Sequence, residues 1–134
     1  MKYLLDTHIL IWFLTGDEKL PKEMRTFIEN DEHDFYYSVA SLLEIELKNI
    51  VHPEQMPITG EKFLKLCRRA YFIKLPIEPS HILELKNLQR RADSPPHKDP
   101  FDRLLICQAI VENMQLMTHD DRIAEYETPN IYKI

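Results

Sequence analysis

Short apolar runs typical of buried strands alternate with helical segments along the whole chain, and this alternation constrains the fold most strongly. We expect strands at residues 2–6, 34–39, 71–75, 116–120 and 131–134. Helical patterns fill the intervals, at residues 8–14, 21–30, 40–48, 61–70, 80–91 and 100–111, with a short turn to Tyr126. The order predicts an α/β domain with a mainly parallel sheet and helices on both faces. The carboxyl ends of the strands then share one edge, where open α/β sheets build their sites.

Length and composition indicate one domain over residues 1–134, with a core that needs no disulfide. Cys67 and Cys107 lie in apolar helical contexts, so we interpret them as reduced thiols. No leader is recognisable and no run approaches the roughly 20 apolar residues that span a bilayer, so we expect a cytoplasmic protein without membrane contact. The net charge of −5 argues against a simple basic DNA-binding module but is compatible with a nuclease whose site is acidic.

Residues 97–109 carry the most informative local pattern. Asp99 precedes Pro100, as an N-cap precedes a proline at the first helical position. The segment from Leu104 to Val111 is almost wholly apolar, which predicts a helix that is buried on most of its circumference. A second carboxylate, Asp102, lies on the same first turn, although one acid would be enough to cap the helix.

Further acids follow the other predicted strands: Asp6 follows the first, Glu44 lies in the helix after the second, and Asp120 and Asp121 follow the fourth. Taken singly, such acids have local explanations: Ser41 with Glu44 has the spacing of a capping box, and Asp120 or Asp121 could cap the last helix. Thr7 is placed to cap a helix from His8. Together, however, acids at one sheet edge would repel one another. A divalent cation removes that cost, and hard carboxylate ligands favour Mg²⁺ or Mn²⁺ over zinc.

Other side chains near these acids have weaker signals. A basic group could hold phosphates or be an ordinary solvated surface: Arg90, Arg91, Lys98 and Arg103. Three histidines follow no zinc-ligand spacing: His8, His97 and His119. Trp12 and Phe13 could stack on bases, although a role in the core or at an interface is the more common one.

Four segments together resemble a known family: LLDTH at 4–8, SVASLLEI at 38–45, HKDPFDRLLICQA at 97–109 and MTHD at 117–120. They are similar to the signature blocks of the PIN domain, in particular of the small VapC-type toxins of bacterial toxin–antitoxin pairs. The resemblance implies a three-layer α/β/α fold with sheet order 3-2-1-4-5 and a nuclease that cleaves RNA with Mg²⁺ or Mn²⁺. It also implies a cognate antitoxin, and we expect a homodimer. By position the family's acidic quartet falls on Asp6, Glu44, Asp102 and Asp120, with Thr118 as a hydroxyl partner and Asp99 as an additional acid.

Phosphodiester cleavage suggests how these roles divide. We assign Asp6 and Asp102 as primary metal ligands, Asp120 as a ligand directly or through water, and Glu44 as a ligand or as the group that orients the attacking water. A response-regulator receiver is disfavoured because Asp6 has no acidic neighbour, and an aspartyl phosphatase because Asp6 is followed by Thr-His rather than by x-Asp. A non-catalytic PIN-like module that binds RNA or a partner protein remains the alternative.

Overall fold

A parallel sheet of five strands organises the computed structural model, which describes residues 1–134. The strands are β1 (Lys2–Leu5), β2 (Asp34–Ser38), β3 (Ile73–Leu75), β4 (Gln115–Thr118) and β5 (Ile131–Lys133). They pair in parallel in the order β3-β2-β1-β4-β5. The α/β class, the parallel sheet and the order 3-2-1-4-5 are therefore confirmed.

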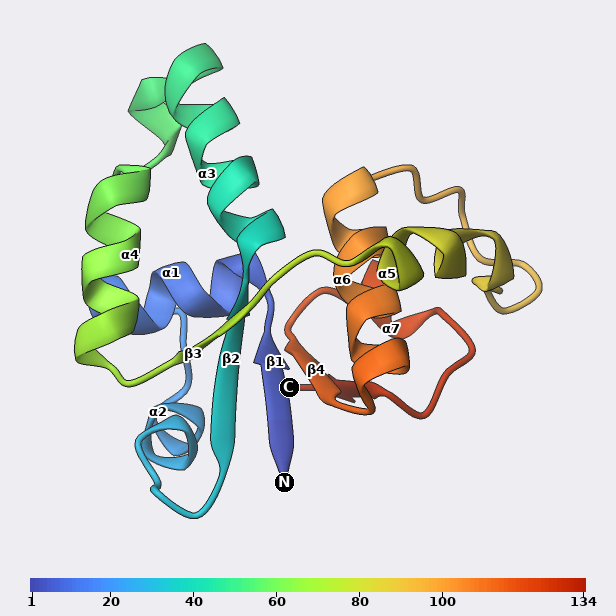
Figure 1. The fold of residues 1–134 in the computed structure, drawn as a ribbon, viewed down its shortest axis with the longest axis horizontal. Helices are drawn as coiled ribbons and strands as arrows, with labels where there is room; N and C mark the ends of the chain where they lie inside the picture. Colours follow the sequence, from blue (N-terminus) through green and yellow to red (C-terminus); the bar gives the residue numbers. More distant parts are fainter.

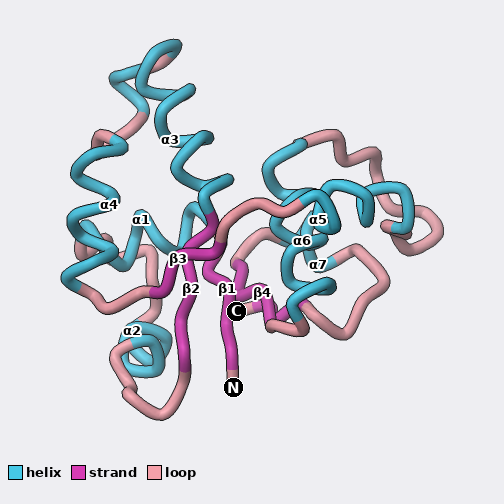
Figure 2. The backbone as a smooth tube through the Cα atoms, in the orientation of Figure 1, coloured by secondary structure: helices cyan, strands magenta, loops and turns pink.

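Helices lie on both sides of this sheet (Figures 1 and 2). One side carries α1 (Thr7–Thr15), α2 (Lys22–Ile28) and α4 (Gly60–Arg69), and the other α5 (Pro79–Leu83), α6 (Pro100–Glu112) and α7 (Asp121–Ala124). Helix α3 (Val39–Val51) leaves the end of β2 and contacts both α4 and α6. Two 3₁₀ turns, η1 (Pro53–Gln55) and η2 (Glu84–Asn87), follow α3 and α5. None of the helices combines the length and the apolar character that crossing a membrane would require.

The central strand β1 shows why the sheet is buried on both faces. Tyr3 and Leu5 join a large apolar cluster with α1, α2 and α4, whereas Leu4 joins a second cluster with α6 and α7. Successive strand residues point to opposite faces, so an uninterrupted apolar run is what a sheet covered on both sides requires.

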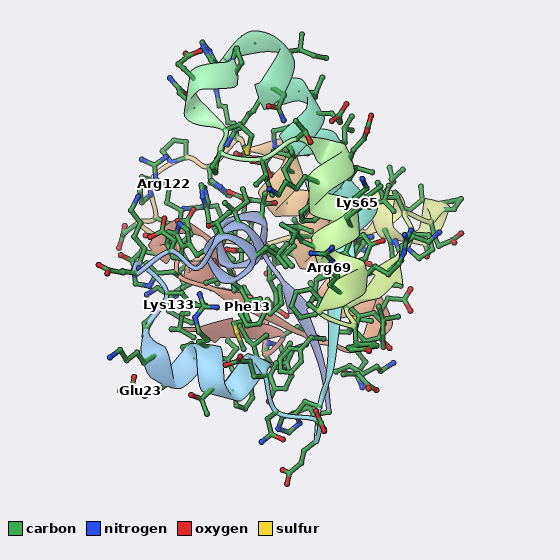
Figure 3. All side chains as sticks on the ribbon, turned by 90° about the vertical axis from the view of Figure 1, so that its left-hand side faces the viewer. Phe13, Glu23, Lys65, Arg69, Arg122 and Lys133 are labelled. Carbon is green, nitrogen blue, oxygen red and sulfur yellow. The ribbon has the colours of Figure 1, made fainter.

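Helix α4 has the amphipathic pattern of an outer-layer helix. Phe63 and Cys67, one turn apart, are fully buried. Lys65 and Arg69 project from the opposite, exposed side of the helix (Figure 3). Helix α6 differs because it is packed more completely, and four consecutive side chains from Leu105 to Gln108 are fully buried. The apolar stretch from Leu104 onward therefore forms the core helix that the sequence predicts.

The predicted helix 80–91 is wrong beyond Asn87, and from Glu84 to Asn87 it is a 3₁₀ turn and not an α-helix. α5 ends at Leu83, η2 ends at Asn87, and the chain becomes extended at Leu88. Its continuation pairs with the segment after α7: the main-chain N–H of Arg91 donates to Glu125, and Gln89 accepts from Glu127. Tertiary hydrogen bonding thus replaces the helical bonds that local propensity favours.

Two predicted caps are also wrong, and each helix begins one residue earlier than expected. Asp6, not Thr7, is the N-cap of α1, and its carboxylate accepts from the N–H of Ile9. Ser38, not Ser41, is the N-cap of α3. The hydroxyls of Thr7 and Ser41 hydrogen-bond each other over 2.9 Å and so connect α1 to α3.

Candidate active site

Asp6 occupies the central position at the carboxyl edge of the sheet. Its main-chain N–H continues the pairing of β1 with β4 by donating to Met117 over 3.1 Å. Its carboxylate is buried; Oδ1 accepts from Ile9 over 2.8 Å and Oδ2 accepts from the Thr118 hydroxyl. Burial is the main cause that raises the pKa of Asp6, against the opposing effect of these hydrogen bonds. Chain order reverses between β1 and β4, so Asp6 stands at the switch point of the sheet.

Glu44 reaches the same edge from α3. It is 5% exposed, and its Oε2 lies 3.2 Å from the Lys48 ammonium one turn along the helix. Its other oxygen, Oε1, is buried without a hydrogen-bond partner. A buried carboxylate oxygen without a donor is costly, and a nearby cation or donor would compensate it.

Asp99 and Asp102 have different environments at the start of α6. Asp99 is exposed, and its Oδ1 accepts from the N–H groups of Phe101 and Asp102, as predicted for an N-cap. Asp102 has a side chain that is only 18% exposed, and its Oδ2 lies 3.2 Å from His97 Nε2. Burial raises the pKa of Asp102 to about 8, with further contributions from the charges of Asp99, Glu44, Asp6 and Asp120.

The Asp120 carboxylate also acts as a helix cap, here at the start of α7. Its Oδ1 accepts from the N–H of Arg122, and its own N–H donates to the Thr118 hydroxyl over 3.0 Å. Thr118 therefore connects the backbone at Asp120 to the carboxylate of Asp6. Asp121 lies differently: it is exposed and pairs with Lys133, and it is not among the acids whose charges act on Asp102.

The four predicted acids thus converge from four segments of the chain. The charges of Asp6, Glu44 and Asp120 all bear on Asp102, and that of Asp120 bears on Asp6. As the side chains stand, no three acidic, histidine or cysteine groups are arranged to hold one ion. The carboxylates are therefore close enough to repel one another without forming a finished coordination geometry.

Two small pockets open beside these acids. One, of about 280 Å³, includes Glu44 and Asp99 in its lining together with Leu47, Val51 and Phe101. The other, of about 200 Å³, is lined by Asp6, His8, Trp12, His119 and Asp120. The acids therefore have openings to the surface on two sides.

The four predicted phosphate-binding residues separate into two pairs. Arg90 bonds to Glu125, with its guanidinium 4.9 Å from the ring centre of Tyr126, and Arg91 donates to the carbonyl of Ala124 over 2.7 Å. Arg90 and Arg91 therefore connect the segment after η2 to α7 and the residues that follow it. Lys98 and Arg103 form no ion pair within 4.0 Å and flank the first turn of α6.

His97 is a site residue whose role the sequence did not indicate. Its Nε2 faces Asp102, and its Nδ1 lies 2.9 Å from the Tyr126 hydroxyl. Burial is the main cause that lowers the pKa of His97, with a further contribution from the charge of Arg90, and the ring bridges the Asp102 carboxyl group and the Tyr126 hydroxyl. No spacing rule predicts the contact between His97 and Tyr126, because the two residues are 29 positions apart in the sequence. The Glu44–Lys48 pair, in contrast, could have been found from its i, i+4 spacing.

Comparisons with known proteins identify the family and the fold. The PIN domain family model matches residues 3–128. Among solved structures, a chain of VapBC2 from Rickettsia felis, bound to a DNA fragment from their promoter, has a TM-score of 0.68 and 16% identity. The match covers 100% of this chain and 98% of that one, so the two share a fold. No curated protein matches the sequence. Because the family model spans nearly the whole chain, this protein belongs to the PIN domain family.

Proposed function

We propose that this chain is a metal-dependent ribonuclease and the toxin of a toxin–antitoxin pair. The observation that carries the proposal is the convergence of Asp6, Glu44, Asp102 and Asp120 at the switch point of the sheet. Burial and, after it, the charges of the neighbouring acids raise the pKa of Asp102 and lower stability, so the arrangement requires a compensating function. Membership of the PIN family supports nuclease activity, which is usual in that family.

The donor set suits Mg²⁺ or Mn²⁺. All four groups offer hard carboxylate oxygens, and Glu44 Oε1 is a buried acceptor with no donor. Asp6 and Asp102 would be the primary ligands, Asp120 a direct or water-mediated one, and Glu44 a ligand or the group that orients the water. When bound, such an ion lowers the pKa of the attacking water and offsets charge on the phosphate.

The surrounding residues hold the acids in position. Thr118 and Ile9 fix both oxygens of Asp6, so its carboxylate has one orientation. His97, itself held by Tyr126, does the same for one oxygen of Asp102. Lys98 and Arg103, which have no acidic partner, are placed to bind the phosphates of an RNA strand next to the acids.

The toxin assignment has support in the surface of α3 and in the structural relative. Leu43, Leu47, Ile50 and Val51 are exposed on this helix, and Leu47 and Val51 line the pocket that contains Glu44. An antitoxin would cover this apolar surface and place an arginine or lysine among the acids. The solved VapBC2 structure has the same fold.

A homodimer would cover a second exposed apolar surface. Ile82 and Leu83 on α5 and Val111 on α6 are each more than a third exposed, and the two helices are in contact. We expect Leu83→Lys to shift the sedimentation of the protein from dimer to monomer. An unchanged sedimentation coefficient would exclude this surface as the interface.

Two experiments test the proposed function. Expression of the parent alone should arrest growth, whereas Asp6→Ala and Asp102→Ala should not. The purified parent should cleave RNA with Mg²⁺ or Mn²⁺ and lose this activity in EDTA. Asp34→Ala is the matched control, because Asp34 is exposed at the opposite end of β2. Cleavage that survives both site substitutions would refute the assignment.

The alternative is a PIN-like module that binds RNA or a partner protein without cleaving. The exposed apolar surface of α3 is compatible with this alternative, because such a surface can bind a partner whether or not the protein cleaves RNA. It predicts that the folded parent binds RNA but shows no cleavage that depends on metal and on Asp102.

A further inference from the structure

Three rings surround the small pocket beside Asp6 and Asp120. We call this the ring pocket; its lining is Asp6, His8, Trp12, His119 and Asp120, and its volume is about 200 Å³. His8 and Trp12 stand one turn apart on α1, and His119 follows β4. The ring pocket therefore joins the acids to a set of flat, polarisable side chains.

Trp12 is the central ring of this set. Its ring centre lies 6.0 Å from that of His8, with a tilt of 39°, and 5.8 Å from that of His119, with a tilt of 66°. A contact of 3.0 Å between His119 Nδ1 and the main-chain oxygen of Ile134 holds the third ring. The three rings are tilted against one another rather than stacked in parallel, and each of them lines the pocket.

The environment of Trp12 is not that of a side chain used only for packing. It is half-buried against the core cluster around α1, and the rest of the ring lines the pocket. Its indole N–H has no hydrogen-bond partner within the protein. The N–H is open to solvent at the pocket, so it is available to a bound ligand beside the acids.

Electrostatics explains why such rings would be needed there. The chain has a net charge of −5, and its site concentrates carboxylates, so attraction to phosphates at this edge depends on a few cationic groups such as Lys98 and Arg103. Stacking of a base on an aromatic face does not depend on net charge and tolerates any base. A ring pocket next to the acids would therefore add base contacts to the few phosphate contacts that Lys98 and Arg103 can make.

We propose that the ring pocket binds one base of single-stranded RNA, stacked on Trp12 and contacted by His8 and His119. This inference depends on the proposed function for its substrate class, and it adds a base-binding position next to the scissile phosphate. It requires unpaired RNA, because a base in a duplex has no free face to offer.

Trp12 is the only tryptophan of the chain, so its fluorescence reports on the pocket directly. The first measurement titrates the parent protein, in EDTA to prevent cleavage, with short single-stranded RNA oligonucleotides. An abasic oligonucleotide with the same backbone is the matched ligand. We expect saturable quenching by the base-containing RNA and none by the abasic strand. Equal quenching by both ligands, or none by either, would overturn the proposal.

Variants test the same inference through cleavage. Trp12→Leu keeps an apolar side chain but no ring face, and should raise KM for RNA roughly tenfold while kcat stays within a few-fold. Trp12→Phe keeps a ring and should restore most of the affinity. Tyr71→Leu removes an aromatic side chain that is 90% exposed and far from the acids, and should leave KM unchanged. Melting temperatures of all three variants show that they are folded.

The outcomes separate this inference from the proposed function. If the parent cleaves RNA but Trp12→Leu keeps the parental KM, the ring pocket does not bind a base and the nuclease assignment stands. If the parent fails to cleave yet shows base-dependent quenching, the base site stands and the nuclease assignment fails.

Discussion

Replacing Asp102 with Asn should stabilise the protein in the absence of metal, and the gain should grow with pH. Asn keeps the size of the side chain and a hydrogen-bonding group but removes the charge that burial and, after it, four neighbouring acids disfavour. A carboxyl whose pKa is higher in the folded state than in the unfolded state binds its proton more tightly when folded. The parent therefore loses stability as the pH rises from about 4 to about 8, and this loss levels off above pH 8. The variant lacks this loss.

The magnitude follows from the shift in the pKa of Asp102. A rise from 3.8 to about 8 corresponds to an upper limit of about 5–6 kcal/mol at high pH. The side chain is 18% exposed, and solvent screening and local relaxation reduce the effect, so we expect roughly 2–3 kcal/mol. For a domain of this size that is a rise in melting temperature of roughly 5–10 °C at pH 8.

The assay is thermal or urea unfolding of both proteins in EDTA, from pH 4 to pH 9, with Asp34→Asn as the control for an exposed aspartate. The stability difference should be close to zero near pH 4 and largest at pH 8 and above. Millimolar Mg²⁺ or Mn²⁺ should stabilise the parent and have little effect on the variant.

A different result would refute the reasoning. Asp102 lies in the first turn of α6, where a negative charge favours the helix dipole by about 0.3–1 kcal/mol. If this effect dominates, the Asn variant is less stable than the parent at neutral pH, with or without metal. A stability difference that does not change with pH would likewise show that repulsion at Asp102 is negligible.

Three further substitutions test the packing and the support of the site. His97→Ala should raise the Mg²⁺ concentration for half-maximal RNA cleavage by about tenfold, because Asp102 loses the group that orients it, and metal titrations of activity measure this. Phe63→Ala, at a fully buried position, should lower the free energy of unfolding by about 3–4 kcal/mol in urea melts. Gly60→Ala would place a Cβ 2.2 Å from Glu46 Oε1, so the carboxylate must move and release the Gly60 N–H. We expect a loss of about 1 kcal/mol that shrinks in a Glu46→Ala background, as a double-mutant cycle would show.

Local sequence patterns determined the elements and the positions of the acids. The apolar runs, the Asp99–Pro100 helix start and the alternation of strand and helix each follow from short-range rules, and the structure agrees with them. Because all strands are parallel, Asp6 and Thr118 had to meet at one edge. The convergence of the acids could be predicted for the same reason.

Tertiary structure alone decided which groups support the acids. His97 contacts Asp102 because the segment after η2 pairs with the end of α7, and that pairing also ends the helix predicted to reach Arg91. The Thr7–Ser41 contact joins residues 34 apart and depends on where two helices begin. Caps and strand ends follow from neighbours in the sequence, whereas the partner of a buried side chain depends on which distant segment packs against it.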